Sequence, residues 1–317
     1  MMPANNADQL HIACAADGKY LPHCAATLAS VFACDAPEKI IVHFMHSPNM
    51  DRVSRDQLFD WIKAQGATLN PLVIPDEAVS DLPRIPSIPQ IMWYRVLLPR
   101  LLPELDRILY MDADIIAMSS LRPLWETSLE GQWLAAVDNV MEPHVRKHPV
   151  ELGLASENDY FNSGVLLFNL KQMRADDCTA GILEFARNPG RKLSWPDQDA
   201  LNIVLASRRV HLHPRWNCQN TLFFCNHGEH TFGKQLMQEA LREPGLLHFE
   251  GYHLTKPWHY MCTHPHRDLY WKYRKKTPWP EKNPDGFTLA NAVIRPLPTA
   301  WWPLAFRIKN RLRKLLA

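Results

Sequence analysis

The stretch LYMDADII, residues Leu109–Ile116, places two aspartates inside an otherwise apolar run. The segment Arg107–Tyr110 is typical of a buried parallel strand, where a bare carboxylate is costly unless a cation or hydrogen-bond donors meet it. Asp112 and Asp114 stand two residues apart after that strand, so both side chains can reach one divalent ion. Taken alone, the pair also fits a strand that ends in a solvated acidic turn. The stretch therefore predicts a buried strand that ends at a candidate metal site.

Composition limits the class of protein. The 317 residues are 46% hydrophobic, which is enough for a full core. The seven cysteines form no dense framework, which favours a reducing compartment over secretion. The segment Met1–Gln9 lacks the pattern of a signal peptide, and no apolar run is long enough to span a membrane. We therefore expect a cytoplasmic protein, either free or attached to a membrane surface.

Strand-like and helix-like segments alternate through the first two hundred residues. The predicted strands are Leu10–Ala16, Lys39–His46, Thr68–Ile74, Arg107–Met111, Trp133–Val137 and Gly164–Asn169. The predicted helices are Leu21–Cys34, Met50–Gly66, Met92–Leu98, Lys171–Arg187 and Asp197–Ala206. This alternation indicates an α/β fold with a mostly parallel sheet, in which ligands gather at the carboxyl ends of strands. Asp17, Asp112, Asp114 and Asp138 follow predicted strands, so we expect them on one rim.

Six segments occur in an order that is typical of one family. They are AADGKY at Ala15–Tyr20, Tyr94-Arg95, YMDAD at Tyr110–Asp114, FNSGV at Phe161–Val165, PDQD at Pro196–Asp199, and His248 followed by KPW at Lys256–Trp258. From about Leu10 to Trp279 the chain resembles glycosyltransferase family 8. Within that family it is similar to the bacterial galactosyl- and glucosyltransferases of lipopolysaccharide or lipooligosaccharide synthesis. The resemblance implies one GT-A catalytic domain over residues 1–275, which retains anomeric configuration as it moves a hexose from UDP-galactose or UDP-glucose to such a glycan.

The resemblance also implies a metal cofactor, Mn²⁺ or Mg²⁺, that bridges the diphosphate of the donor. Asp112, Asp114 and His248 are its implied ligands. A nucleotide-sugar transferase must neutralise its diphosphate leaving group, and a neutral imidazole suits Mn²⁺ as a ligand. Without the resemblance, His248 fits a hydrogen-bonding histidine at the edge of the core.

The implied contacts to the nucleotide part of the donor are Ala15, Asp17, Tyr20, Arg95, Asp112, Ala113, Gly251 and Lys256. Asp17 would accept a hydrogen bond from the uracil ring, and Tyr20 would stack on it. Lys256 would contact the diphosphate. Four residues separate Lys256 from Gly251 where the family has two, so the loop between them must bulge. Asp17 also fits a helix cap, Tyr20 a packing residue and Lys256 a solvated lysine.

Four residues are implied to surround the donor hexose and to carry catalysis: Arg95, Asn162, Asp197 and Gln198. Gln198 would lie on the face of the sugar opposite the leaving group. A carboxamide is a poor nucleophile compared with the carboxylate that retaining glycosidases use, so we favour front-face attack by the acceptor hydroxyl. Asp197 also fits a helix N-cap, and the two roles are compatible.

Two other classes of protein are weighed against this reading. A phosphohydrolase of the haloacid-dehalogenase type would carry its D-x-D at the first strand, whereas Asp112 and Asp114 lie past residue 100. A non-catalytic protein that binds nucleotide sugars or glycans would have no need for intact Asp197 and Gln198.

A group of soft and imidazole side chains occurs later in the chain, at His211, His213, Cys218, Cys225, His227 and His230. These residue types could hold zinc, but no C-x-x-C is present. We instead interpret Trp216, Asn217, Phe223 and Phe224 as part of a loop on the acceptor side.

The C-terminal residues 276–317 are predicted to be a proline-rich linker followed by a basic amphipathic helix. No acidic residue follows Asp285, and six cations do, so the rest of the chain is acidic although the net charge is +2. The apolar face of the predicted helix consists of Trp301, Leu304, Ala305, Ile308, Leu312, Leu315 and Leu316. This profile indicates a helix that binds an anionic membrane surface, and the alternative is a terminal helix packed on the body. A general nucleic-acid binder would carry its basic patch on the folded domain, so we expect no nucleic-acid partner.

Overall fold

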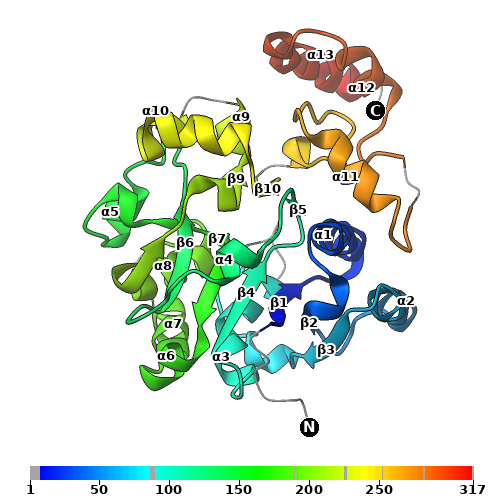
Figure 1. Ribbon diagram of the computed structural model, residues 1–317. Helices are drawn as coiled ribbons and strands as arrows, with labels where there is room; N and C mark the ends of the chain where they lie inside the picture. Colours follow the sequence, from blue (N-terminus) through cyan, green and yellow to red (C-terminus); the bar gives the residue numbers. More distant parts are fainter. Residues whose placement is uncertain are drawn as a thin grey trace.

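The computed structural model describes residues 8–85, 90–188, 190, 192–224, 227–251, 253–280 and 283–315, with the side chains of 253 and 310–315 outside the description. Its centre is a seven-stranded sheet in the order β3-β2-β1-β4-β7-β6-β8 (Figure 1). The strands are β1 Leu10–Ala15, β2 Ile40–His46, β3 Thr68–Val73, β4 Arg107–Met111, β6 Leu134–Asp138, β7 Phe161–Asn169 and β8 Arg209–His211. Only β7 is antiparallel to its neighbours in this sheet. The prediction of a mostly parallel α/β sheet is therefore confirmed.

A second, three-stranded sheet joins β5 Ile115–Ala117, β10 Leu246–His248 and β9 Cys218–Gln219. The strand β10 runs antiparallel to β5 and places His248 opposite Ile115. Because β5 begins directly after Asp114, this pairing brings His248 close to the D-x-D segment. Asp114 and His248 are 134 positions apart in the sequence.

Helices cover both faces of the central sheet. The helices in the described part of the chain are α1 Leu21–Cys34, α2 Arg52–Ala64, α3 Leu98–Leu101, α4 Arg122–Trp125, α5 His148–Leu152, α6 Leu170–Ala175, α7 Cys178–Arg187, α8 Pro196–Leu205, α9 Asn220–Phe224, α10 His227–Arg242, α11 Arg267–Arg274, α12 Leu289–Ile294 and α13 Trp302–Leu315. One core layer packs α1 and α2 against the sheet, and the opposite layer contains α7 and α8. A third apolar cluster lies between α1, α10, α11 and the small sheet. Every residue of β1 and β2 is buried, as expected for parallel strands covered on both sides.

Some predicted elements differ in form from those observed. The segment predicted as a helix at Met92–Leu98 is a 3₁₀ helix, Gln90–Leu97, followed by the short α3. The helix predicted at Lys171–Arg187 is divided into α6 and α7, because Asp177 adopts a left-handed backbone conformation with φ of 46°. The strand β7 begins at Phe161, three residues before its predicted start at Gly164.

The C-terminal part begins on the body and ends away from the central sheet. The helix α11 packs on α1, where the hydroxyl of Tyr270 lies 2.6 Å from Nδ1 of His23. A bridge between His259 and Asp285 holds the following segment, and α12 and α13 then lie at the edge of the molecule, at the upper right in Figure 1. None of the helices within the described ranges is long and apolar enough to cross a membrane.

Candidate active site

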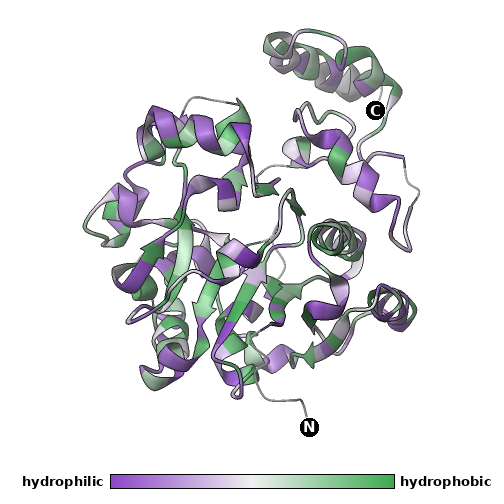
Figure 2. Ribbon diagram, in the orientation of Figure 1, coloured by the Kyte–Doolittle hydropathy of each residue, from purple (hydrophilic) through white to green (hydrophobic). Residues whose placement is uncertain are grey.

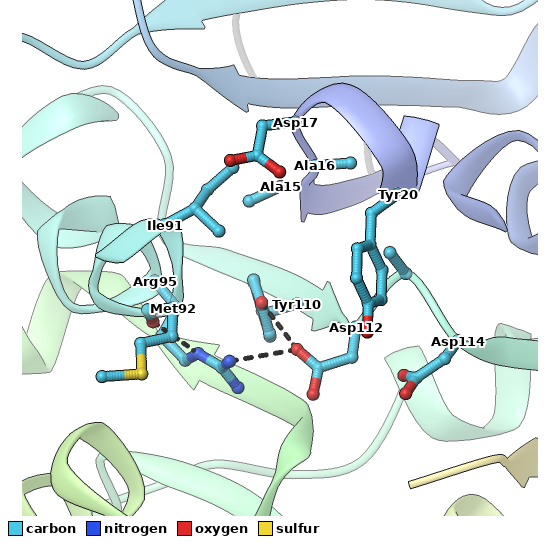
Figure 3. Close-up of a pocket in the computed structure, with 11 residues that line it drawn as sticks. Ala15, Ala16, Asp17, Tyr20, Ile91, Met92, Arg95, Tyr110, Asp112 and Asp114 are labelled. Carbon is cyan, nitrogen blue, oxygen red and sulfur yellow. Dashed lines mark hydrogen bonds and ion pairs between the residues drawn. The ribbon is translucent and has the colours of Figure 1, made fainter. Parts of the chain in front are cut away.

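A cavity of about 170 Å³ opens at the carboxyl ends of β1 and β4 (Figure 3). Its lining consists of Ala15, Ala16, Asp17, Tyr20, Ile91, Met92, Arg95, Tyr110, Asp112, Ala113 and Asp114. Six of the eight residues expected to contact the nucleotide are among them, namely Ala15, Asp17, Tyr20, Arg95, Asp112 and Ala113. Ile91 and Met92 are not expected from the sequence, because apolar residues in a predicted helix give no sign that they face a cavity.

Three side chains at this cavity present atoms to one point. Asp112, Asp114 and His248 each offer one ligand atom, and these atoms all lie within 4.8 Å of one another. Nε2 of His248 lies 3.4 Å from Oδ1 of Asp114 and 3.9 Å from Oδ2 of Asp112. Two carboxylates and an imidazole at this spacing suit a divalent ion such as Mn²⁺, so the residues fit the metal that the sequence predicts.

The protonation of His248 is set from its far side. Its Nδ1 lies 2.8 Å from Oδ1 of Asn217, and Nδ2 of Asn217 donates at 2.8 Å to Oδ1 of Asn162. Since Oδ1 of Asn162 also accepts from the backbone N–H of Gly164, the orientation of both amides is fixed. Nδ1 of His248 therefore donates to Asn217, which leaves Nε2 as the atom that faces the carboxylates.

Asn217 is completely buried at this position. The interpretation of Asn217 as part of an acceptor-side loop is wrong, because its amide supports His248 from behind. Trp216 is also buried, and its ring packs so closely on Gly245 that a Cβ atom on residue 245 would lie 2.7 Å from it. Phe224 is exposed, and the acceptor-side placement of Phe223 and Phe224 stays a prediction.

Arg95 connects the two acidic groups of the site. The arginine is 6% exposed, and its NH2 lies 3.1 Å from Oδ1 of Asp112 and 3.4 Å from Oδ2 of Asp197. Burial opposes its charge, but Asp112, Tyr110 and Asp197 raise the pKa of Arg95 above its usual value. Burial also raises the pKa of Asp197 to about 6, although Arg95 opposes the shift. Arg95 thus links Asp112 with Asp197, and Figure 3 shows its contact with Asp112.

Lys256 lies within the same charge cluster. It is buried, and its ammonium group donates to Oδ2 of Asp114. Burial opposes ionisation, but Lys256 and His248 hold the pKa of Asp114 well below its usual range. Asp114 and Asp112 likewise outweigh burial and raise the pKa of His248. The site therefore holds Asp114 charged, with Lys256 and His248 close to it.

Gly251 is separated from the cavity lining. Its φ of 84° is a left-handed conformation that favours glycine, and the short 3₁₀ helix His253–Thr255 takes up the extra residues before Lys256. Gly251 is absent from the described lining of the cavity, so its contact with a nucleotide stays a prediction.

Two of the residues expected around the hexose, Arg95 and Gln198, bond to Ser163. NH1 of Arg95 donates to the carbonyl of Ser163 at 2.5 Å, and the backbone N–H of Ser163 donates to Oε1 of Gln198 at 2.9 Å. Asn162 is buried, and its Nδ2 donates at 3.0 Å to Asn139. Contacts through Arg95, Ser163 and Asn217 thus connect Arg95, Asn162, Asp197 and Gln198 with the group of Asp112, Asp114 and His248.

The first turn after β1 supplies the other wall of the cavity. Asp17 precedes the 3₁₀ helix Gly18–Tyr20, but its side chain makes no capping hydrogen bond there, and burial raises its pKa. Tyr20 is 38% exposed and lies edge-on to Trp258. Both side chains are therefore available to a ligand in the cavity.

Other candidate residues lie apart from this cavity. Asp138 is at the same rim, but it binds Arg209 at 2.7 Å and His211 at 3.0 Å. Four described members of the histidine and cysteine group have partners outside it: Asp138 for His211, Glu239 for His213, Glu157 for His230, and backbone carbonyls for Cys218. Cys225 lies outside the described residues. Within the described ranges, Asp112, Asp114 and His248 form the one group that could hold a metal.

Comparison with solved structures defines the class of fold. A crystal structure of galactosyltransferase LgtC in complex with donor and acceptor sugar analogs matches 92% of this chain and 99% of that chain, with a TM-score of 0.74 at 23% identity. The fold is that of a GT-A-type nucleotide-sugar transferase. Residues 11–262 match Glycosyl transferase family 8, and the chain belongs to this family.

Curated relatives match along most of their length. General stress protein A of Bacillus subtilis is 25% identical over 275 residues, which cover 85% of this chain and 94% of the relative. The lipopolysaccharide 1,3-galactosyltransferase of Salmonella typhimurium is 26% identical over 285 residues, which cover 87% of this chain and 80% of the relative.

Proposed function

We propose that the protein is a metal-dependent, retaining hexosyltransferase that uses UDP-galactose or UDP-glucose. The observation that carries this proposal is the convergence of Asp112, Asp114 and His248 beside a cavity that Asp17 and Tyr20 also line. A divalent ion at the triad would supply positive charge to the diphosphate as it leaves. Family membership and the resemblance of the chain to lipopolysaccharide transferases agree with this activity.

Each residue of the site has a distinct task in this proposal. Asp17 accepts from the base, and the ring of Tyr20 covers it. Lys256 adds a positive charge to the phosphate side, and Arg95 keeps the carboxylates of Asp112 and Asp197 in place. Asp197 accepts hydrogen bonds from hydroxyls of the hexose. The acceptor hydroxyl attacks from the side of the departing diphosphate, one oxygen of which takes its proton.

The proposed acceptor is a glycan of the lipopolysaccharide or lipooligosaccharide type. Relatives named for lipopolysaccharide galactosyl and glucosyl transfer support this choice. Such acceptors are lipid-linked, and the C-terminal helix presents exposed apolar residues: Trp301 directly before α13, and Leu304 and Ile308 within it. Arg307, beside Ile308 in the sequence, is also exposed. We propose that this helix attaches the enzyme to the inner face of the cytoplasmic membrane, and that residues 1–275 form the catalytic domain.

The other two classes have less support. The D-x-D segment follows β4 in the middle of the sheet, and a haloacid-dehalogenase nucleophile would follow the first strand. A protein that only binds its ligand would have no need for the ion pair of Arg95 and Asp197 beside Asp112, Asp114 and His248.

A donor screen tests the proposed function. We expect UDP release from UDP-galactose or UDP-glucose in the presence of Mn²⁺ and a lipooligosaccharide acceptor, and none with a chelator. Asp112→Ala and Asp114→Ala should abolish release, whereas Asp138→Ala, at the same rim but outside the triad, should retain most of it. NMR of the product anomer tests retention. Turnover that a chelator leaves unchanged would rule out the metal-dependent mechanism.

A further inference from the structure

The side-chain carboxamide of Gln198 is held at both ends. Its Oε1 accepts from the backbone N–H of Ser163 at 2.9 Å and from the hydroxyl of Ser163 at 3.1 Å, and its Nε2 lies 3.3 Å from the hydroxyl of Tyr160. A backbone N–H can only donate, so the atom that faces Ser163 must be the carbonyl oxygen. The amide nitrogen of Gln198 therefore points to Tyr160.

The Tyr160 end of this arrangement has a fixed direction. Tyr160 is completely buried, and its hydroxyl contacts Oδ1 of Asp199, which is also completely buried. The carboxylate of Asp199 also accepts hydrogen bonds from Nε2 of His148 at 2.8 Å and from the backbone N–H groups of Ser194 and Trp195 at 2.7 and 3.1 Å. Because Asp199 accepts, the hydroxyl hydrogen of Tyr160 points to Asp199, and its oxygen is left to accept from Gln198.

The direction of the hydrogen bond between the Ser163 hydroxyl and Gln198 is also fixed. NH1 of Arg95 donates to Oγ of Ser163 at 3.2 Å, so the hydroxyl hydrogen of Ser163 is directed to Gln198. Two donors then occupy Oε1 of Gln198, and Tyr160 takes one of the two hydrogens on Nε2. Among the residues that the structure describes, the second hydrogen has no acceptor. Gln198 is only half-buried, so this hydrogen can reach a ligand.

We propose that Tyr160 and Asp199 are positioning residues that orient Gln198 so that it presents an N–H group, and not its carbonyl oxygen, to the bound donor sugar. The proposal rests on the proposed function, because it takes the sugar to lie beside Gln198. An N–H group donates a hydrogen bond to a hydroxyl or ring oxygen of the hexose. The carbonyl oxygen, occupied by Ser163, is withheld from the anomeric carbon, which agrees with front-face attack.

The orientation can be measured without any activity. In a ¹⁵N-labelled protein, the side-chain amide signals of Gln198 are assigned by their loss in Gln198→Ala. Tyr160→Phe should shift these signals and speed the exchange of one amide hydrogen with solvent. The fold should survive, because Asp199 keeps His148 and two backbone donors. Tyr270→Phe removes a comparably buried hydroxyl, bonded to His23 and Arg274, and should leave the Gln198 signals unchanged.

Kinetics test whether Tyr160 acts through Gln198. Tyr160→Phe should lower kcat by roughly tenfold, the size expected for one lost hydrogen bond, and change the KM for the UDP-hexose by less than about twofold. In a Gln198→Ala background, the same substitution should have no further effect on kcat. The effects of Tyr270→Phe and Gln198→Ala should simply multiply.

Two results would overturn the proposal: unchanged Gln198 amide signals in Tyr160→Phe, or effects of Tyr160→Phe and Gln198→Ala that multiply. A wild-type protein that releases no UDP from any UDP-hexose would instead disprove the proposed function. The NMR experiment would then still decide the orientation of Gln198.

Discussion

At the scale of single residues, Asp112 and Asp114 each use one carboxylate oxygen to bond to neighbouring side chains. The other oxygen of each faces Nε2 of His248. Oδ1 of Asp112 accepts from Tyr110 at 2.7 Å and from Arg95, which leaves Oδ2 toward His248. Oδ2 of Asp114 is taken by Lys256, which leaves Oδ1 toward His248. The protein thus fixes the direction of both carboxylates in advance, and this lowers the cost of organising them around an ion.

Asn217 should control metal affinity although it cannot touch the ion. Asn217→Leu removes the acceptor of the Nδ1 hydrogen of His248 and should lower Mn²⁺ affinity by roughly 10- to 100-fold, as is typical for such supporting groups. Titration calorimetry with Mn²⁺ measures this. Asn70→Leu is a matched control, because Asn70 donates at 2.9 Å to another buried histidine, His43, on β2. Equal metal affinity of the two variants would contradict the role of Asn217.

The pH dependence of transfer should report Asp197. Burial raises the pKa of Asp197 to about 6, so the group loses its charge and its ion pair with Arg95 as the pH falls through about 6. We therefore expect kcat to fall on the acid side with a midpoint near pH 6. Asp197→Asn should lower kcat with little change in UDP affinity and should remove this acid limb. An acid limb that persists in Asp197→Asn would assign it to another group.

The residues that carry charge could be predicted from the sequence, and those that support them could not. Asp112 and Asp114 are recognisable because two acids in an apolar run are costly without a partner. Asn217 gives no such signal, since its importance depends on its position behind His248, 31 residues along the chain. The ring of contacts around Ser163 has the same origin in tertiary structure.

At the scale of elements, the small sheet determines where His248, the third proposed metal ligand, lies. The strands β5 and β10 have three residues each, and their antiparallel pairing sets His248 opposite Ile115. Periodicity cannot identify strands this short. The long parallel strands β1 and β2 were predictable because burial on both faces makes them continuously apolar. The division between α6 and α7 was not, because Asp177 gives no glycine or proline signal for its left-handed conformation.

The strand β7 should tolerate no side chain at Gly164. A Cβ atom there would lie 2.3 Å from Cε1 of the buried His248. Gly164→Ala should therefore displace the imidazole and abolish metal-dependent UDP binding, which calorimetry can measure. Gly181→Ala in α7 meets only an ordinary contact of 3.6 Å with Val204 and should bind like the wild type. Normal UDP binding by Gly164→Ala would mean that His248 is not a ligand.

At the scale of the whole molecule, the C-terminal helices α12 and α13 expose several large apolar side chains. Hydrophilic and hydrophobic residues are interspersed along α13 in Figure 2, and the large apolar residues Leu289, Val293, Trp301 and Leu304 are exposed. Lys309 donates to Asn291 at 2.8 Å, which joins α13 to α12. In α13, Leu304 and Ile308 are exposed, whereas Trp302, Ala305 and Phe306 are partly buried. The side chains of Leu312 and Leu315 and all of Leu316 lie outside the description.

Removal of the tail should separate membrane binding from catalysis. Truncation before Trp301 removes Arg307, Lys309, Arg311, Arg313 and Lys314, each worth about 1 kcal/mol near an anionic surface and less at high salt. We expect the full chain, but not the truncated one, to sediment with vesicles that contain anionic lipid. Transfer to a short soluble acceptor should be nearly unchanged. Equal sedimentation of both proteins would show that the tail serves the fold alone.

The most direct test of the metal-dependent mechanism is the calorimetric titration of UDP into the wild-type protein with Mn²⁺ and with a chelator. We predict UDP binding with Mn²⁺, its near-complete loss with the chelator, and the same loss in Asp114→Ala and His248→Ala in the presence of Mn²⁺. Equal UDP affinity with and without the metal would contradict the assignment of Asp112, Asp114 and His248 as the metal site of a UDP-sugar transferase.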